Sequence, residues 1–221
     1  MLLIESKNQE KYISDYLEVD LPDIVHEVIS DQKSDKSSRS LFKQDRKNDD
    51  ASQRSSFSLK QRLYLEDIHN LIPERAPGLR ITKAAICEIE GSLSIIAPFY
   101  VSEVDCEGHM PGFPFLPLAE AGRVLAQAGA ILVSYHAKVV ENKSDWMTPL
   151  VYKVGEVLSG QQGYLFPNNT VCIIATIKKL RGPLYSTECH GYLDKKHIFS
   201  MPKIQYFLSD DSRLWRGIKS V

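Results

Sequence analysis

Residues 117–133 read PLAEAGRVLAQAGAILV, and this stretch decides the fold. Pro117 suits the first position of a helix, where its missing N–H group costs nothing. From Pro117 to about Tyr135 almost every residue is small or apolar. A helix that is apolar on nearly every side must be buried, so the sequence predicts a long helix in the centre of the protein.

Three polar residues lie together on one face of this helix. Glu120, Arg123 and Gln127 are spaced i, i+3 and i+7, which places their side chains on the same face. Burying a charge is costly unless the charge is paired or hydrated. The stripe therefore indicates a pocket, a hydrated interface or an internal ion pair, and the simplest alternative to a site is a Glu120–Arg123 pair at an oligomer interface.

A glycine-rich loop precedes the helix. Residues 106–114 read CEGHMPGFP and place His109 just before the helix begins. The first N–H groups of a helix have no partner within it, and its N-terminus is the positive end of the dipole, so such an end can polarise a carbonyl group. Glycines let the backbone approach a ligand closely. His109 is therefore a candidate catalytic residue, with a purely structural histidine as the alternative.

The rest of the chain predicts an α+β domain. A short amphipathic helix is expected at 64–72. Strands are expected at 79–90, 92–101, 149–158, 171–180, 184–194 and 198–208. One long helix packed against one antiparallel sheet is an α+β arrangement.

The chain divides into an N-terminal extension, residues 1–58, and a domain, residues 59–221. Residues 31–56 mix serines with charges of both signs and contain few apolar side chains. Such a segment cannot bury enough apolar area to offset its chain entropy, so disorder is expected there. Residues 21–30 form a possible short helix that could dock on the domain, bind a partner or remain a tail.

The composition excludes several classes of protein. The net charge of −1 gives no electrostatic reason to bind nucleic acid or an anionic membrane. The four cysteines are too widely spaced for a metal site or a disulfide framework, so no metal and a reducing, cytoplasmic location are expected. No apolar run reaches the ~20 residues of a membrane span.

The sequence resembles the β-hydroxyacyl-acyl-carrier-protein dehydratases of type II fatty acid synthesis. The loop and helix of that family read roughly G-H-F-P-G-x-P-x-x-P-G-x-x-x-x-E-A-x-A-Q-A, and residues 108–128 read GHMPGFPFLPLAEAGRVLAQA without a gap. Upstream, residues 67–79, DIHNLIPERAPGL, look like the opening segment of the family. The resemblance implies a hot-dog fold, in which an antiparallel sheet wraps a long central helix.

The resemblance also implies a substrate and a site. The family acts on acyl thioesters carried on the phosphopantetheine of acyl carrier protein or on coenzyme A, and needs no other cofactor. Its subunits form dimers, and each site combines the loop histidine of one subunit with a helix carboxylate of the other. His109 matches the catalytic histidine. Gly112, Leu118 and Gln127 occupy substrate-binding positions, although Leu118 stands where the family has glycine.

The helix carboxylate does not match, because its position is occupied by Arg123. Arginine stays protonated near neutral pH and cannot act as an acid. Glu120, one turn earlier, could serve as a relocated catalytic carboxylate in a self-sufficient dehydratase. Alternatively, a related hot-dog subunit could supply the carboxylate in a heterodimer.

Three further interpretations remain open. Glu120 and His109 could activate water, which would make the protein a thioesterase. The domain could bind an acyl chain or acyl carrier without catalysis, with Arg123 contacting a phosphate. Finally, the chain could be a structural interaction protein that keeps the loop only for folding.

Overall fold

The computed structural model describes Leu17 and residues 57–107, 110, 112–159 and 164–215. The expected disorder at 31–56 and the possible helix at 21–30 lie outside the described residues. So do the candidate catalytic residue His109 and its neighbours Gly108 and Pro111.

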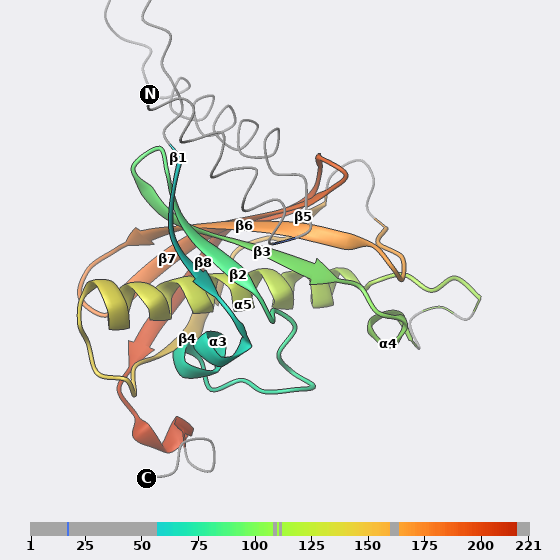
Figure 1. Cartoon of the computed structure of the whole chain (residues 1–221). Helices are drawn as coiled ribbons and strands as arrows, with labels where there is room; N and C mark the ends of the chain where they lie inside the picture. Colours follow the sequence, from blue (N-terminus) through green and yellow to red (C-terminus); the bar gives the residue numbers. More distant parts are fainter. Residues whose placement is uncertain (1–16, 18–56, 108–109, 111, 160–163, 216–221) are drawn as a thin grey trace, which may run out of the picture.

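The described chain folds as one antiparallel sheet and one long helix (Figure 1). In chain order the elements are β1 (Phe57–Leu63), α3 (Leu65–Leu71), β2 (Ala84–Ile89), β3 (Ser92–Tyr100), α4 (Glu103–Cys106), α5 (Leu118–Tyr135), the π-helical turn His136–Val140, β4 (Thr148–Val154), β5 (Leu158–Ser159), β6 (Thr170–Lys179), β7 (Leu184–Leu193), β8 (Lys196–Ser209) and the 3-10 turn Ser212–Trp215. The predicted α+β class is confirmed.

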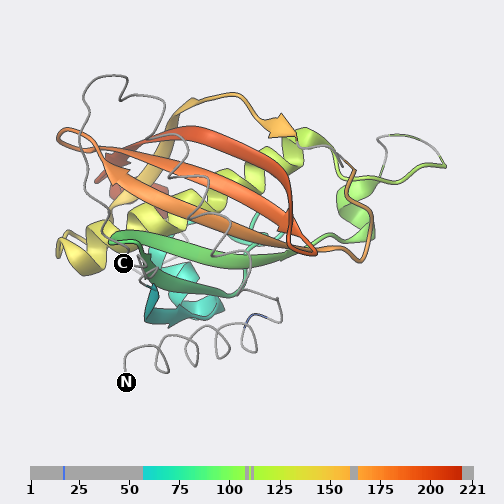
Figure 2. The ribbon, with the colours of Figure 1, turned by 90° about the horizontal axis from the view of Figure 1, so that it is seen from above.

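The strands follow the order β1-β2-β3-β6-β7-β8-β4, and β5 pairs with β8. Every pairing in the sheet is antiparallel. Figures 1 and 2 show α5 running along one face of this curved sheet, with α3 on the same side. The edge strands are β1 at one end and β4 at the other, and β4 is the strand that follows α5 in the chain.

The centre of α5 is buried against the sheet. From Val124 to Tyr135 its residues are buried, apart from the half-buried Ala126. Gly129 lets the helix approach closely, because a Cβ atom there would collide with the Tyr206 hydroxyl and lie 2.6 Å from Thr187 Oγ1. Tyr206 in turn donates a hydrogen bond of 2.8 Å to the Ala126 carbonyl oxygen. The apolar helix of the sequence is therefore the centre of the main core.

Apolar side chains occupy both faces of the sheet. Alternate strand residues point to opposite faces, so Ile86 and Ile95 pack in the main core with α5. Their neighbours Cys87 and Ile96 belong to a second cluster on the outer face. Leu17 from the N-terminal extension is part of this second cluster.

Three short elements were not expected from the sequence. Strand β1 begins at Phe57, two residues before the expected start of the domain, and its polar residues Lys60, Gln61 and Arg62 conceal its strand character. Helix α4 and strand β5 are 4 and 2 residues long, too short to produce a periodic pattern. Pro117 is the N-cap of α5, so the helix begins at Leu118, one residue later than expected. Within the described residues, no helix is long and apolar enough to cross a membrane.

Candidate functional site

The polar stripe of α5 lies where the helix leaves the core. Glu120 and Arg123 form an ion pair of 3.4 Å between Arg123 Nη1 and Glu120 Oε2, with side chains 47% exposed for Arg123 and 35% for Glu120. Arg123 Nη2 also donates a hydrogen bond of 3.1 Å to the Gly78 carbonyl oxygen. The ion pair expected as one alternative therefore forms within the chain. Its exposure means that it contributes little to stability.

Gln127, the third residue of the stripe, is buried and bonded on both ends of its amide. Its Oε1 accepts hydrogen bonds from the backbone N–H groups of Arg80 (2.7 Å) and Ile81 (3.0 Å). Its Nε2 donates to the Gly78 carbonyl oxygen (3.2 Å) and to Glu74 Oε2 (3.4 Å). Because only an oxygen atom can accept from both N–H groups, these two bonds fix which end of the amide is the oxygen and which is the nitrogen. Gln127 thus joins the helix to the segment after α3 and holds a carboxylate.

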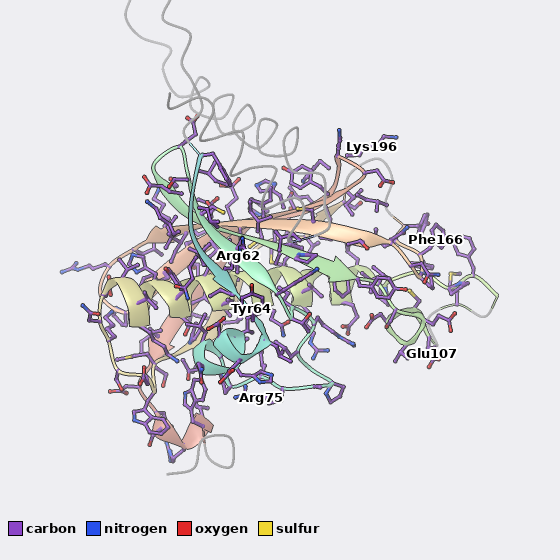
Figure 3. The ribbon with its side chains drawn as sticks, viewed as in Figure 1. Arg62, Tyr64, Arg75, Glu107, Phe166 and Lys196 are labelled. Atoms are coloured by element: carbon purple, nitrogen blue, oxygen red, sulfur yellow. The ribbon has the colours of Figure 1, made fainter. Side chains whose placement is uncertain are left out.

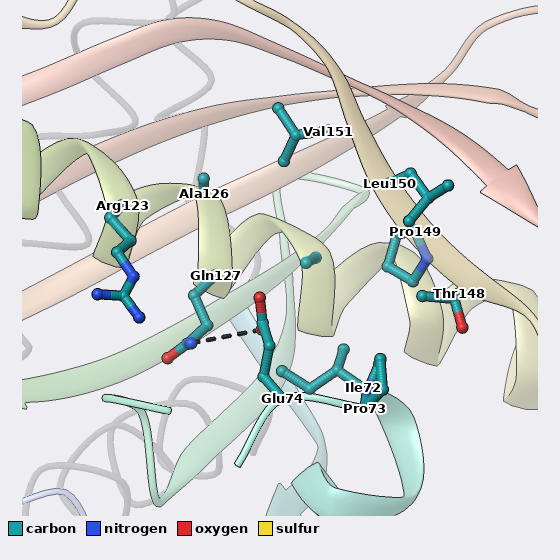
Figure 4. Close-up of a pocket in the computed structure, with 11 residues that line it drawn as sticks. Ile72, Pro73, Glu74, Arg123, Ala126, Gln127, Thr148, Pro149, Leu150 and Val151 are labelled. Carbon is teal, nitrogen blue, oxygen red and sulfur yellow. Dashed lines mark hydrogen bonds between the residues drawn. The ribbon is translucent and has the colours of Figure 1, made fainter. Parts of the chain in front are cut away.

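A pocket lies between this part of α5, the segment after α3 and strand β4. Its lining residues are Ile72, Pro73, Glu74, Arg123, Ala126, Gln127, Ala130, Thr148, Pro149, Leu150 and Val151. Most of them are apolar, and Figure 4 shows Gln127 and Glu74 close together, with Thr148 apart from them beside Pro149. An apolar pocket with a few converging polar groups is the usual form of a small-molecule site.

Glu74 is the carboxylate of this pocket, and the sequence analysis missed it. Figure 4 shows its side chain pointing from the segment after α3 toward α5, with the hydrogen bond to Gln127 drawn. Glu120, the expected carboxylate, is not among the lining residues. Arg75 stabilises this segment, because its guanidinium donates to the carbonyl oxygens of Ile72 (2.9 Å) and His69 (3.0 Å) at the end of α3. No local pattern connects Glu74 to α5, because the two meet only through the tertiary fold.

Strand β4, which forms one wall of the pocket, has an apolar and exposed edge. Leu150, Val151, Tyr152 and Val154 are 40%, 49%, 68% and 47% exposed. Natural edge strands usually carry charges or prolines that prevent pairing with another chain. Strand β4 contains Pro149 and Lys153, so it is partly protected, but its four exposed apolar side chains still offer a surface that a partner could cover.

The loop before α5 is anchored on both sides of its undescribed residues. Before these residues, Asp105 of α4 forms an ion pair with Arg80, with 2.8 Å between Arg80 Nη2 and Asp105 Oδ1. Asp105 also accepts hydrogen bonds from the backbone N–H group and the hydroxyl group of Ser102. After the undescribed residues, the predicted substrate-binding residue Gly112 has φ +80°, a conformation that favours glycine. The position of His109 relative to the pocket is outside the described residues.

An aromatic cluster supports the other side of the loop. The ring centroid of Phe113 lies 5.8 Å from that of Phe115, 5.8 Å from that of Tyr164 and 5.5 Å from that of Phe166. The Leu116 N–H group also donates a hydrogen bond of 2.7 Å to the Leu165 carbonyl oxygen. Figure 3 shows Phe166 and Glu107 at the same end of the molecule. Leu118, a predicted substrate-binding residue, is 44% exposed at the start of α5, and the pocket lining does not include it.

All four cysteines lie in the described part of the chain, and all are free and buried. In the same part of the chain, no group of three or more histidine, cysteine, aspartate or glutamate side chains is arranged to hold a metal ion.

An antiparallel sheet wrapped along one long buried helix defines a hot-dog protein. The dehydratase heterocomplex ApeI:P from Xenorhabdus doucetiae has this fold in common with the chain, with a TM-score of 0.52 and 13% identity, covering 69% of this chain and 97% of that chain. The fold implied by the sequence resemblance is therefore confirmed.

In sequence, the chain is dehydratase-like. It is 29% identical over 124 residues to the 3-hydroxyacyl-[acyl-carrier-protein] dehydratase FabZ of Clostridium botulinum, strain Eklund 17B / Type B. This match covers 55% of this chain and 82% of that protein. The corresponding protein of strain Alaska E43 / Type E3 matches to the same extent. No protein-family model matches the chain.

Proposed function

We propose that the chain is a dehydratase subunit that acts on 3-hydroxyacyl thioesters and shares its active site with a related hot-dog subunit. The substrate would be carried on the phosphopantetheine of acyl carrier protein or on coenzyme A, in the cytoplasm. The similarity to the FabZ dehydratases supports the reaction class.

The observation that carries the shared site is the position of Arg123. It occupies the place of the catalytic carboxylate in the dehydratase motif, and it lines the pocket. A guanidinium cannot donate a proton to a leaving hydroxyl group near neutral pH. We assign the acid to a carboxyl group of another subunit, and Glu74, which also lines the pocket, is the alternative that the assays distinguish.

Two findings support a partner of the same fold. The pocket is bounded by β4, whose exposed edge carries Tyr152 and Val154, so a second subunit at this edge would lie beside the pocket. The solved structure ApeI:P is, by its own name, a dehydratase heterocomplex. The number and identity of the subunits around this chain are part of the proposal.

The proposed reaction is general acid–base elimination. His109 removes the proton at C2, next to the thioester carbonyl, and the electron pair forms the C2=C3 double bond. The C3–O bond breaks, and the carboxyl group of the partner gives its proton to the departing hydroxyl, so that water leaves. Backbone N–H groups at the start of α5 would stabilise the negative charge on the thioester oxygen. The histidine then returns its proton to the carboxylate.

Subunit complementation tests this proposal. A chain that carries both His109→Ala and Arg123→Glu can supply the acid but not the base, whereas the wild-type chain supplies the base but not the acid. The two are assayed separately and after co-expression, with 3-hydroxyacyl and saturated acyl thioesters of acyl carrier protein. Mass spectrometry follows both loss of water and release of free acid.

We expect dehydration by the co-expressed pair at least about 100-fold above that of either chain alone, the scale of general acid catalysis. Full activity of the wild-type chain alone would overturn the shared site in favour of a carboxylate of its own. Free acid and free thiol would instead show a thioesterase. No product from any combination would contradict a catalytic role.

A further inference from the structure

The outer face of the sheet, opposite α5, carries an apolar cluster of its own. We call the following residues the outer cluster: Phe57, Ala85, Cys87, Ile89, Ile96, Cys172, Ile174 and Tyr192. They come from β1, β2, β3, β6 and β7, and each alternates with a strand neighbour that faces the opposite way. An apolar face of this extent needs a covering element, because exposed apolar patches promote association.

The strand register makes the outer cluster continuous. Ala85 of β2 pairs with Ile96 of β3, and Ile96 pairs with Ile174 of β6. In the next row, Cys172 of β6 pairs with Tyr192 of β7. Directly paired residues have Cβ atoms about 4.5–5.5 Å apart, so these side chains form one surface rather than scattered contacts.

The outer cluster is buried although α5 lies on the other side of the sheet. Cys87, Ile96 and Ile174 are 0% exposed. Leu17 packs in the same cluster and is itself 0% exposed. The side chain that completes this surface thus comes from the N-terminal extension, 40 positions before the first residue of β1.

We propose that the outer face of the sheet is a docking surface for the N-terminal segment of the same chain, residues 13–21 around Leu17. Leu17 is helical. In the sequence, Ile13 precedes it by four positions and Leu21 follows it by four. A helix through Leu17 would place all three on one face, so the segment could offer three apolar side chains to an apolar sheet.

The connecting residues favour docking within one chain. Residues 18–56 join Leu17 to β1, and a chain of that length, taken as a random coil, would have a root-mean-square span on the order of 35 Å. Such a linker can reach across the sheet and keeps the segment at an effective concentration of roughly millimolar. Even weak intrinsic affinity then suffices to keep the face covered. On this proposal the segment around Leu17 belongs to the folded unit and reserves the outer face against other proteins.

Cysteine accessibility in the full-length protein tests this proposal. Cys87 and Cys172 belong to the outer cluster, whereas Cys189 is buried in the main core near α5. Burial raises the pKa of Cys87 and raises that of Cys172 and Cys189 to about 12, which suppresses the reactive thiolate in all three. Native alkylation with N-ethylmaleimide, located by peptide mass spectrometry, reports each site separately.

Leu17→Asp places a charge in the apolar contact. We expect it to accelerate alkylation of Cys87 and Cys172 by at least about tenfold through local opening, and to leave Cys189 unchanged. Leu180→Asp is the matched control, because Leu180 is 38% exposed and outside the outer cluster. It should leave all three rates unchanged.

Three results would overturn the proposal. The first is an unchanged rate at Cys87 and Cys172 in Leu17→Asp. The second is equal acceleration at Cys189 in the milder Leu17→Ala, which would assign Leu17 to global stability rather than to local cover. The third is wild-type protection that weakens on tenfold dilution, because a concentration-dependent cover would come from a second copy of the chain.

Discussion

Arg123 and Glu74 are the two charged residues among those that line the pocket. Both line it, but they come from different elements, and Gln127 holds the carboxylate of Glu74 through a 3.4 Å hydrogen bond. Glu120 is instead directed to Arg123, also at 3.4 Å, and does not line the pocket. Among the residues that line the pocket, Glu74 is therefore the only carboxylate.

Two substitutions separate these carboxylates. In the chain assayed alone, Glu74→Gln should remove at least about 90% of any residual dehydration, because an amide cannot donate the proton at neutral pH. Glu120→Gln should leave the rate within about threefold, because its carboxylate is outside the pocket. Steady-state rates of water loss measure both. The reverse order of effects would assign the role to Glu120, as the sequence analysis expected.

Restoring the motif carboxylate is a second test at this scale. Arg123→Glu places a carboxyl group in the pocket where the dehydratase motif has one. We expect dehydration by the chain alone to rise by about 100-fold, the usual scale of general acid catalysis. Arg123→Gln removes the same positive charge without adding an acid, and it should give no such gain. An equal gain from both variants would mean that Arg123 acts only by inhibiting the site.

Among the elements, α5 carries both the core and the site. Its apolar centre made it predictable from the sequence. The longer strands were predictable too, because their apolar residues fit a sheet. Strand β1, helix α4 and strand β5 escaped prediction because they are polar or short, and tertiary pairing rather than local propensity stabilises them. Gly129 shows the same limit inside α5, because a glycine in a helix indicates nothing about which strand it faces.

Gly129→Ala should destabilise the fold by about 1–3 kcal/mol, the usual cost of overpacking a core. The added methyl group would meet Tyr206 and Thr187, and this cost exceeds the roughly 1 kcal/mol that alanine gains over glycine in a helix. Gly122→Ala is the control in the same helix, because its Cβ atom would contact only the side-chain ends of Met201 and Val157 at 3.1 and 3.2 Å. Urea unfolding measures both, and an equal loss would refute close approach at Gly129.

At the scale of the whole molecule, the sheet has two apolar surfaces against which another segment or subunit can pack. The outer face contains Leu17, which belongs to the chain itself. The β4 edge carries Tyr152 and Val154, which remain exposed in the single chain. The second surface lies beside the pocket, so association there and catalysis are expected to depend on each other.

The double variant Tyr152→Lys/Val154→Lys should prevent subunit association through β4. Lysine on an edge strand opposes pairing with another strand, because its charge must stay hydrated. Light scattering coupled to size-exclusion chromatography should show a monomer, whereas Val104→Lys, on α4 and 68% exposed, should leave the oligomer intact. An unchanged oligomer in the double variant would place the interface elsewhere.

The sequence by itself determined the long buried helix and its polar stripe, and it places Arg123 at the carboxylate position of the motif that it resembles. These features depend on neighbours within two helical turns or on an ungapped motif, and local periodicity contains that information. Only the tertiary structure decided that Glu74 enters the pocket, that Gln127 holds it, and that Leu17 completes the outer face. Glu74 and Gln127 are 53 positions apart, and Leu17 lies 40 positions before β1. Packing of the whole sheet against α5 brings such distant residues together, and no local pattern encodes that packing.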